Sequence, residues 1–239
     1  MEKEYDIICF GVIVADILAP GVTESVFEKD MTRVSQVKIA PGGDAFNQAL
    51  NLSALGYKVA LIGRKGNDST GDFLSSYAEK HNIDISHFVL DQQFPTSTTI
   101  VLILPNGERH FIGTLKGTNN NLQISDFLII PSLKAKVVSL GSLYGSLTLL
   151  GKSLEPIFDA LKKKNVILVA DMMHPERGSF DDAIHVLKYL DYFFPNENEA
   201  RSLTKKETIE ECAEKGNGPS EKIFWSILNL KKGPLYCNQ

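Results

Sequence analysis

The sequence lacks the features that mark several large classes of protein. Its three cysteines (Cys9, Cys212 and Cys237) are far apart and form no CxxC pair, so a disulfide scaffold is excluded and a free-thiol, cytoplasmic protein is expected. No apolar run approaches the roughly 20 residues of a membrane span, and the acidic start MEKEYD is unlike a signal peptide. The formal net charge of −4 provides no basic excess for binding nucleic acid or anionic lipid.

Several nucleotide-binding and catalytic motifs are also missing. Gly66 and Gly71 have Walker A spacing, but Asp72-Phe73 stands where that motif requires Lys-Ser/Thr. No GxGxxG follows the first expected strand, and no GxSxG occurs, which disfavours a nicotinamide-dependent Rossmann enzyme and an α/β-hydrolase. The five histidines form no HExxH motif, so a zinc site is disfavoured.

The composition is ordinary for a globular protein, with 43% apolar and 23% charged residues. Apolar segments of strand length alternate with amphipathic segments of helix length. The expected strands are 7–14, 59–62, 137–140, 166–170 and 192–194, and the expected helices are 44–55, 71–81, 151–165, 180–188 and 197–203. This order predicts right-handed crossovers and a doubly wound, mainly parallel α/β sheet.

Two segments interrupt the alternation and predict a small β lid. Residues 98–104 and 109–113 flank Asn106-Gly107, which is a strong signal for a β-hairpin. Residues 20–40 have β-like character and no helical period. We therefore expect lid segments near 12–40 and 96–118, placed over a site at the carboxyl ends of the strands.

The segment Pro41-Gly42-Gly43 precedes a helix that begins at Asp44 and carries Asn47 in its first turns. Glycines let a ligand approach the backbone, and free N–H groups at a helix start favour a hydroxyl or an anion. A tight turn with Asp44 as helix cap is the alternative. Asp16 follows an apolar strand, where its carboxylate can accept hydrogen bonds from two neighbouring hydroxyls; a solvated loop residue is the alternative.

The segment from Asn196 to Glu199 directly follows the expected strand 192–194. The two side chains, three residues apart at a helix start, can face one another across a turn. Glu199 there can hold Mg²⁺ through water, because Mg²⁺ keeps several waters when it binds phosphates. Acidic residues placed to complement the helix dipole are the alternative interpretation.

Taken together, these segments resemble the ribokinase-like, or PfkB, family of carbohydrate kinases. The matching segments run in the family's order from about Glu4 to Glu214. They are DIICFGVIVADI, APGGDAFNQALNLSALG, VALIGRKGNDSTGDFL, TSTTIVLILPNGERHFI, GTN, SLGSLYG, VADMMHP and PNENEA. The resemblance implies a ribokinase-like α/β domain over residues 1–214 and a divergent C-terminal tail over 215–239.

The resemblance also implies a site and a reaction. Asp16, Gly42, Gly43 and Asn47 match positions that hold sugar or nucleoside hydroxyls. Asn196 and Glu199 match the family's Asn-x-x-Glu motif, which organises Mg²⁺ and phosphate, and Asp171 matches a strand-end Asp near the phosphate path. The implied reaction moves the γ-phosphoryl group of ATP to a hydroxymethyl group, and in some relatives the lid pairs with a second subunit.

The family's catalytic base is an Asp in a GAGD segment, and no GxGD occurs in these 239 residues. General-base catalysis contributes about 10²–10⁴ in rate and an oxyanion donor about 10²–10³. We therefore expect a sugar or nucleoside kinase by ancestry that is inactive as this chain. The alternatives are a non-catalytic module for sugar binding or dimerisation, and a truncated gene product of marginal stability.

Overall fold

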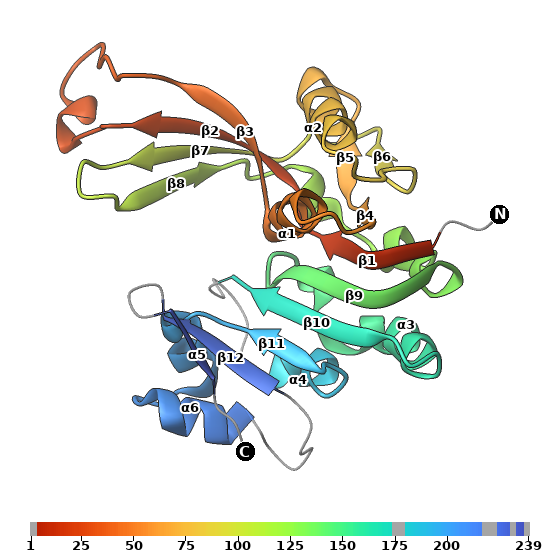
Figure 1. Ribbon diagram of the computed structural model, residues 1–239. Helices are drawn as coiled ribbons and strands as arrows, with labels where there is room; N and C mark the ends of the chain where they lie inside the picture. The colour runs from red at the N-terminus through yellow and green to blue at the C-terminus, as the bar shows by residue number, and fades with distance from the viewer. Residues whose placement is uncertain (1–3, 174–179, 217–223, 230–232, 237–239) are drawn as a thin grey trace.

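The computed structural model describes residues 4–173, 180–216, 224–229 and 233–236, and a seven-stranded sheet is its centre (Figure 1). The strand order is β13-β12-β11-β10-β9-β1-β4. The strands are β1 (Glu4–Gly11), β4 (Val59–Ile62), β9 (Lys134–Leu143), β10 (Ile167–Met172), β11 (Tyr192–Phe194), β12 (Phe224–Asn229) and β13 (Gly233–Tyr236). Every neighbouring pair is parallel except β12 with β13, which confirms the expected mainly parallel sheet.

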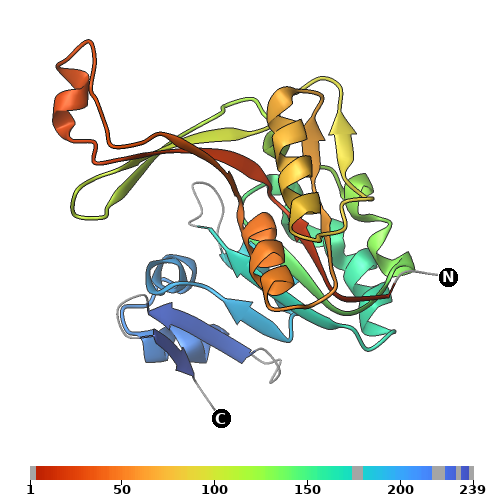
Figure 2. The same cartoon turned by 45° about the horizontal axis from the view of Figure 1, so that its top comes forward.

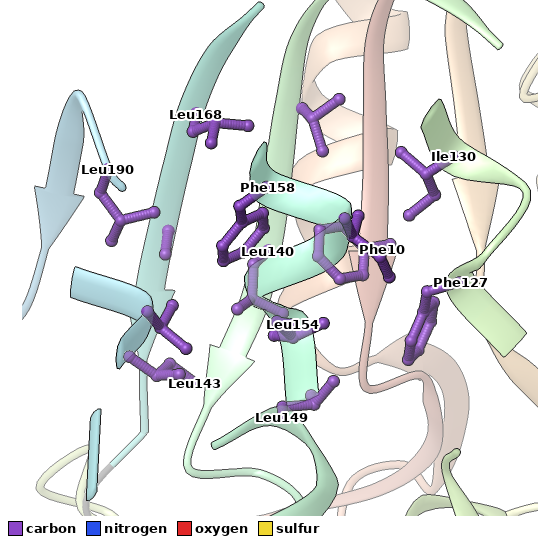
Figure 3. Packing of buried hydrophobic residues seen from close by; sticks show 14 of the residues in the cluster. Phe10, Phe127, Ile130, Leu140, Leu143, Leu149, Leu154, Phe158, Leu168 and Leu190 are labelled. Atoms are coloured by element: carbon purple, nitrogen blue, oxygen red, sulfur yellow. The ribbon is translucent and has the colours of Figure 1, made fainter. Parts of the chain in front are cut away.

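The central strands bury alternate side chains on opposite faces of the sheet. In β1, Ile8 and Phe10 belong to one apolar cluster, whereas Cys9 belongs to another. The first cluster includes Phe158 and is shown in Figure 3; the second includes Phe46. The helices are α1 (Asp44–Ala54), α2 (Ser69–Lys80), α3 (Glu155–Lys162), α4 (Phe180–Leu187), α5 (Glu197–Thr204) and α6 (Ile209–Gly216). Two covered faces explain why β1 reads as a continuous apolar run.

A second, four-stranded sheet forms the lid and projects away from the main sheet (Figure 2). Its order is β3-β2-β7-β8, with β2 (Val14–Pro20), β3 (Lys38–Gly42), β7 (Thr98–Ile103) and β8 (Arg109–Gly113). The hairpin between β7 and β8 is antiparallel, as expected, and Gly107 in its turn has φ +87°. β2 pairs with β7 in parallel and with β3 in antiparallel orientation.

Two predictions at the lid are corrected by the structure. The expected strand 7–14 is two strands, because β1 ends at Gly11 and Val14 already belongs to β2. Gly11 has φ +131°, a conformation that turns the chain out of the main sheet and into the lid. The β-like segment 20–40 forms strand only at its ends; a 3₁₀ turn over Glu24–Phe27 (η1) lies between them.

The expected helix boundaries hold to within one residue except at two starts and at the end of the expected helix 151–165, where α3 stops at Lys162. α2 begins at Ser69 instead of residue 71, because the side chain of Asp68 caps it by accepting from the N–H of Gly71 at 2.7 Å. The expected helix 151–165 begins as a 3₁₀ turn over Gly151–Leu154 (η6) and becomes α-helical only in α3.

The last described strands extend the main sheet. β12 pairs in parallel with β11, and β13 returns antiparallel to β12. The backbone of 224–229 and 233–236 is therefore strand, and the intervening residues 230–232 lie outside the described part of the chain. Of the cysteines, Cys9 and Cys212 are buried free thiols, and Cys237 lies outside the described residues. Within the described ranges, no helix is long and apolar enough to cross a membrane.

The lid is tied to the body through Asp68. Its carboxylate accepts hydrogen bonds from the N–H and the hydroxyl of Thr96, both at 2.7 Å, beside the bond to Gly71. These bonds outweigh burial and lower the pKa of Asp68. Thr96 lies two residues before β7, at the base of the lid. Asp68 belongs to the glycine-rich segment that only partly matches a phosphate loop, so that segment has a structural role at the base of the lid.

Replacing Phe158 should destabilise the fold. Its ring is 1% exposed in the larger apolar cluster, so Phe158→Ala should lower the free energy of unfolding by about 3–5 kcal/mol. Leu115→Ala is the matched control, because Leu115 is 86% exposed, and it should change stability by no more than about 0.5 kcal/mol. Urea unfolding of both variants checks the prediction; an equal loss in both would contradict it.

Candidate active site

The candidate site lies where the carboxyl ends of β1, β9 and β10 meet the start of α1. A Cβ at Gly11 would overlap the carbonyl of Gly141, and a Cβ at Gly141 would overlap the backbone of Ala45. The three backbones therefore approach more closely than any residue with a side chain would permit. As a result, the first turn of α1 sits directly against the end of β9.

Asp16 and the two predicted glycines form the lid side of the site. The carboxylate of Asp16 lies against the Cα of Gly42, where any side chain would overlap it, and Gly43 has φ +81°. Burial raises the pKa of Asp16 to about 6, the charge of Arg109 opposes this shift, and that of Asp44 adds to it. The structure thus brings Asp16, Gly42 and Gly43 together, as the motifs predicted.

Asp44 does not cap α1, contrary to the alternative weighed from the sequence. The N-cap is Gly43, which has no side chain to cap the helix, and the N–H of Asp44 donates to the hydroxyl of Ser142 at 3.4 Å. The carboxylate of Asp44 instead accepts a 2.7 Å hydrogen bond from the hydroxyl of Ser142 at the end of β9. Burial raises the pKa of Asp44, and the bond from Ser142 opposes that shift.

Asp171, at the end of β10, is held by donors from two elements. Its carboxylate accepts from the N–H of Ser142 at 2.7 Å and from the side-chain amide of Gln48, on α1, at 2.8 Å. Ser139 in turn donates to the amide oxygen of Gln48 at 2.7 Å. Burial, followed by the charge of Asp44, raises the pKa of Asp171 to about 7 despite these bonds.

Asn196 and Glu199 face one another across the first turn of α5, as expected. The side chain of Asn196 accepts from the N–H of Glu199 at 2.9 Å, and the carboxylate of Glu199 accepts from the N–H of Asn196 at 2.8 Å. This reciprocal pair is a capping box. Burial, with a contribution from the charge of Asp44, raises the pKa of Glu199 to about 7.

Asp44 is the common neighbour of the predicted acidic residues. Its charge acts on Asp16 at the lid side and on Asp171 and Glu199 at the other side. The four carboxylates therefore share one edge of the sheet. Asn47 lies one turn along α1 and is exposed, and its side chain has no hydrogen bond with another described residue. Its role in holding hydroxyls stays a prediction.

The turn that carries Ser142 is strained. Ser142 has φ +63° and Tyr144 has φ +72°, conformations that cost non-glycine residues of order 1 kcal/mol or more and that cluster at functional sites. The bond from its hydroxyl to Asp44 and the bond from its N–H to Asp171 help to hold it in this conformation. Sequence reasoning missed Ser142 and Gln48, because nothing in a single sequence indicates which distant carboxylates they contact.

The donor set fits a magnesium ion that is carried mainly by phosphates. Within the described residues, no group of three or more His, Cys, Asp or Glu side chains is arranged to hold a metal by itself. Mg²⁺ commonly binds through one or two carboxylates, several waters and the phosphates of its ligand. Glu199 can provide such a contact through water.

The fold and the site define a ribokinase-like α/β protein with a polar site at the carboxyl edge of its sheet. The chain superposes on a PfkB protein from Polaromonas sp. JS666 with a TM-score of 0.77 at 18% identity, covering 96% of this chain and 78% of that one. A fructokinase with bound ATP from Xylella fastidiosa gives a TM-score of 0.73 at 16% identity, covering 93% and 72%.

The sequence comparisons identify the family. The model of the pfkB family carbohydrate kinase matches residues 5–228, so the chain belongs to that family. The match continues past Glu214, where the recognisable motifs end. The ribokinase of Haemophilus influenzae is 27% identical over 174 residues, which are 73% of this chain and 54% of that protein. The chain thus spans little more than half the length of this curated relative.

The raised carboxylate pKa values predict that stability falls as pH rises. Asp171 and Glu199 have pKa values of about 7 in the folded chain, against about 4 when unfolded. Between these values the folded state holds protons that the unfolded state has released, so its stability is lost as pH increases from about 4 to 7. Asp171→Asn should reduce this loss, because an asparagine side chain has no proton to release. The substitution should be tolerated, because the amide of Gln48 can turn over to accept from the new side chain.

Urea unfolding at pH 5 and pH 8 measures the effect. The wild-type chain should lose stability between the two conditions, and Asp171→Asn should lose clearly less. Asp72→Asn, which removes an exposed carboxylate on α2, should keep the wild-type dependence. A wild-type pH profile in Asp171→Asn would contradict the shift assigned to Asp171.

Proposed function

We propose that this chain is the substrate-binding part of a sugar or nucleoside kinase, in which the γ-phosphoryl group of ATP passes to a hydroxymethyl group. One observation carries the proposal: the carboxylate of Asp16 lies against Gly42 at the start of α1, on the edge of the sheet that also holds Glu199. A hydroxyl-binding group and a phosphate-organising group thus share one site. Family membership supports the reaction class, and a structural neighbour holds ATP.

The sugar is placed at the lid side of the site. Asp16 accepts hydrogen bonds from two neighbouring hydroxyls, and the backbone at Gly42 and Gly43 allows the ring to approach. Asn47 adds an amide that can both donate and accept. The charge of Asp16 matters, because hydrogen bonds to a charged group contribute more than those between neutral groups.

The phosphates are placed at the other side of the site. Asn196 and Glu199 organise Mg²⁺ and phosphate, with the ion held by Glu199 through water, and Asp171 borders the phosphate path. When bound, Mg²⁺ neutralises charge on the transferring phosphoryl group. The carboxylates here repel a bare nucleotide, so the chain's own residues favour a nucleotide that arrives with its cation.

The family's base would accept the proton of the reacting hydroxyl, and no GxGD segment occurs in these 239 residues. We therefore expect this chain by itself to bind a sugar without useful turnover. Calorimetry with a panel of pentoses, hexoses and nucleosides should detect binding, and Asp16→Ala should weaken it roughly tenfold to hundredfold, the equivalent of hydrogen bonds to a charged acceptor.

Asp72→Ala is the matched control for Asp16→Ala, because it removes an exposed carboxylate outside the site, and its sugar affinity should equal that of the wild type. A coupled assay of ADP release over the same panel tests the second part. Turnover above about 1 s⁻¹, the low end for kinases, would contradict the expected inactivity. Unchanged sugar affinity in Asp16→Ala would contradict the site.

A second role, dimerisation through the lid, is favoured by a row of isoleucines. The strand register pairs Ile39 with Ile17, Ile17 with Ile100, and Ile100 with Ile112. Paired residues share a face, and these positions alternate with Asp16, so the row lies on the face opposite the site. Three of the four are well exposed: Ile39 at 43%, Ile100 at 39% and Ile112 at 54%. Such an apolar stripe across a whole sheet suits a second copy of the lid.

The dimer is tested by sedimentation equilibrium. The wild-type chain should associate reversibly, and Ile100→Asp should shift it to monomer, because it places a charge in the middle of the row. Phe111→Asp is the control, since Phe111 is also exposed but lies on the Asp16 face. A monomeric wild-type chain, or equal dissociation in both variants, would contradict lid-mediated dimerisation.

A further inference from the structure

The face of the lid that carries Asp16 also carries two cations. Asp16 and Leu18 share this face, because successive side chains of a strand alternate. Leu18 pairs with Lys38 on one side and with Val101 on the other, and Val101 pairs with Phe111. Arg109, two residues before Phe111, lies on the same face. Charge at this face therefore changes sign with distance from the main sheet.

Arg109 is placed toward the site. Its guanidinium lies over the ring of Phe111, 5.9 Å from the centroid, which holds the charge toward Gly113, the end of β8 that is level with Asp16. The charge of Arg109 also stabilises the ionised form of Asp16. Among the described residues, Arg109 has no ion pair with a carboxylate, and the same is true of Lys38.

The rest of the site is acidic. Asp16, Asp44, Asp171 and Glu199 occupy the carboxyl edge and interact with one another. An anionic group of a substrate would be repelled there and attracted toward Arg109. A ligand that carries hydroxyls at one end and an anion at the other is oriented by this gradient, with its hydroxymethyl end at the phosphate side.

We propose that the Asp16 face of the lid holds an anion subsite formed by Arg109 on β8, while Lys38 on the opposite edge strand β3 adds positive charge to the same face. This inference rests on the proposed kinase function and narrows its substrate class to a sugar that carries a carboxylate or a phosphate group. The subsite selects the substrate and takes no part in phosphoryl transfer.

Calorimetry with the full chain tests the subsite, using two matched ligand pairs: glucitol with gluconate, and fructose with fructose 6-phosphate. An anionic ligand should bind roughly tenfold to hundredfold more tightly than its neutral partner, as a charge-assisted contact predicts. Added salt should weaken only the anionic ligand. The pair that shows the gain identifies the anion as carboxylate or phosphate.

At pH 8, two units above the pKa of about 6 of Asp16, the variant Arg109→Gln should abolish the gain while leaving the neutral sugar within about twofold of its wild-type affinity. Arg109→Lys should restore part of it, because lysine keeps the charge without the planar fork. Lys134→Gln is the matched control: it removes one positive charge at the start of β9, the end of that strand away from Ser142, and should leave both affinities unchanged.

The outcomes separate this inference from the proposed function. Neutral sugars that bind as tightly as their anionic partners, or an equal effect of Arg109→Gln on both, would overturn the anion subsite alone. The sugar site itself would then stand, provided that Asp16→Ala still weakens the neutral ligand. Binding of no sugar, neutral or anionic, would overturn the proposed function and the subsite with it.

Discussion

The close contact of three backbones at Gly11, Gly141 and Ala45 is the constraint on which the site depends. It brings the end of β1, the end of β9 and the first turn of α1 within van der Waals distance of one another. Ser142 then reaches both Asp44 and Asp171 from a single position. A side chain at Gly141 would push α1 away from the sheet, and one at Gly11 would displace the end of β9, so either would separate these groups.

Much of the fold could be predicted from the sequence, because its periodicity and its turn residues agree. The strands Val59–Ile62 and Tyr192–Phe194 and the hairpin around Gly107 have the expected positions. Predictions failed where tertiary contacts override local pattern. The run from Ile7 to Val14 is apolar throughout, and only the packing against Gly141 shows that the chain leaves the main sheet at Gly11.

The residues of the candidate site also divide into those that local motifs predicted and those that only tertiary contacts bring into the site. Asp16, Gly42, Gly43, Asn196 and Glu199 were accessible from motifs, because each lies in a short local pattern. Ser142 and Gln48 lie within matching segments, but no pattern indicated their partners, and helix capping by Asp44 was the alternative interpretation. The bond between Ser142 and Asp44 joins residues 98 positions apart in the chain, a contact that depends on how α1 packs on β9. The role proposed for Arg109 likewise depends on the strand register of the lid, which places this residue on the same face as Asp16.

The carboxylates that share one edge of the sheet also allow the protein to bind and release protons near neutral pH. With pKa values of about 7, Asp171 and Glu199 are partly protonated in the ligand-free chain at pH 7. A cation arriving beside them favours the ionised forms and displaces those protons into solution. Under the proposed function, the heat of nucleotide binding would therefore include the ionisation heat of the buffer, and the number of protons released would report how many carboxylates the cation approaches.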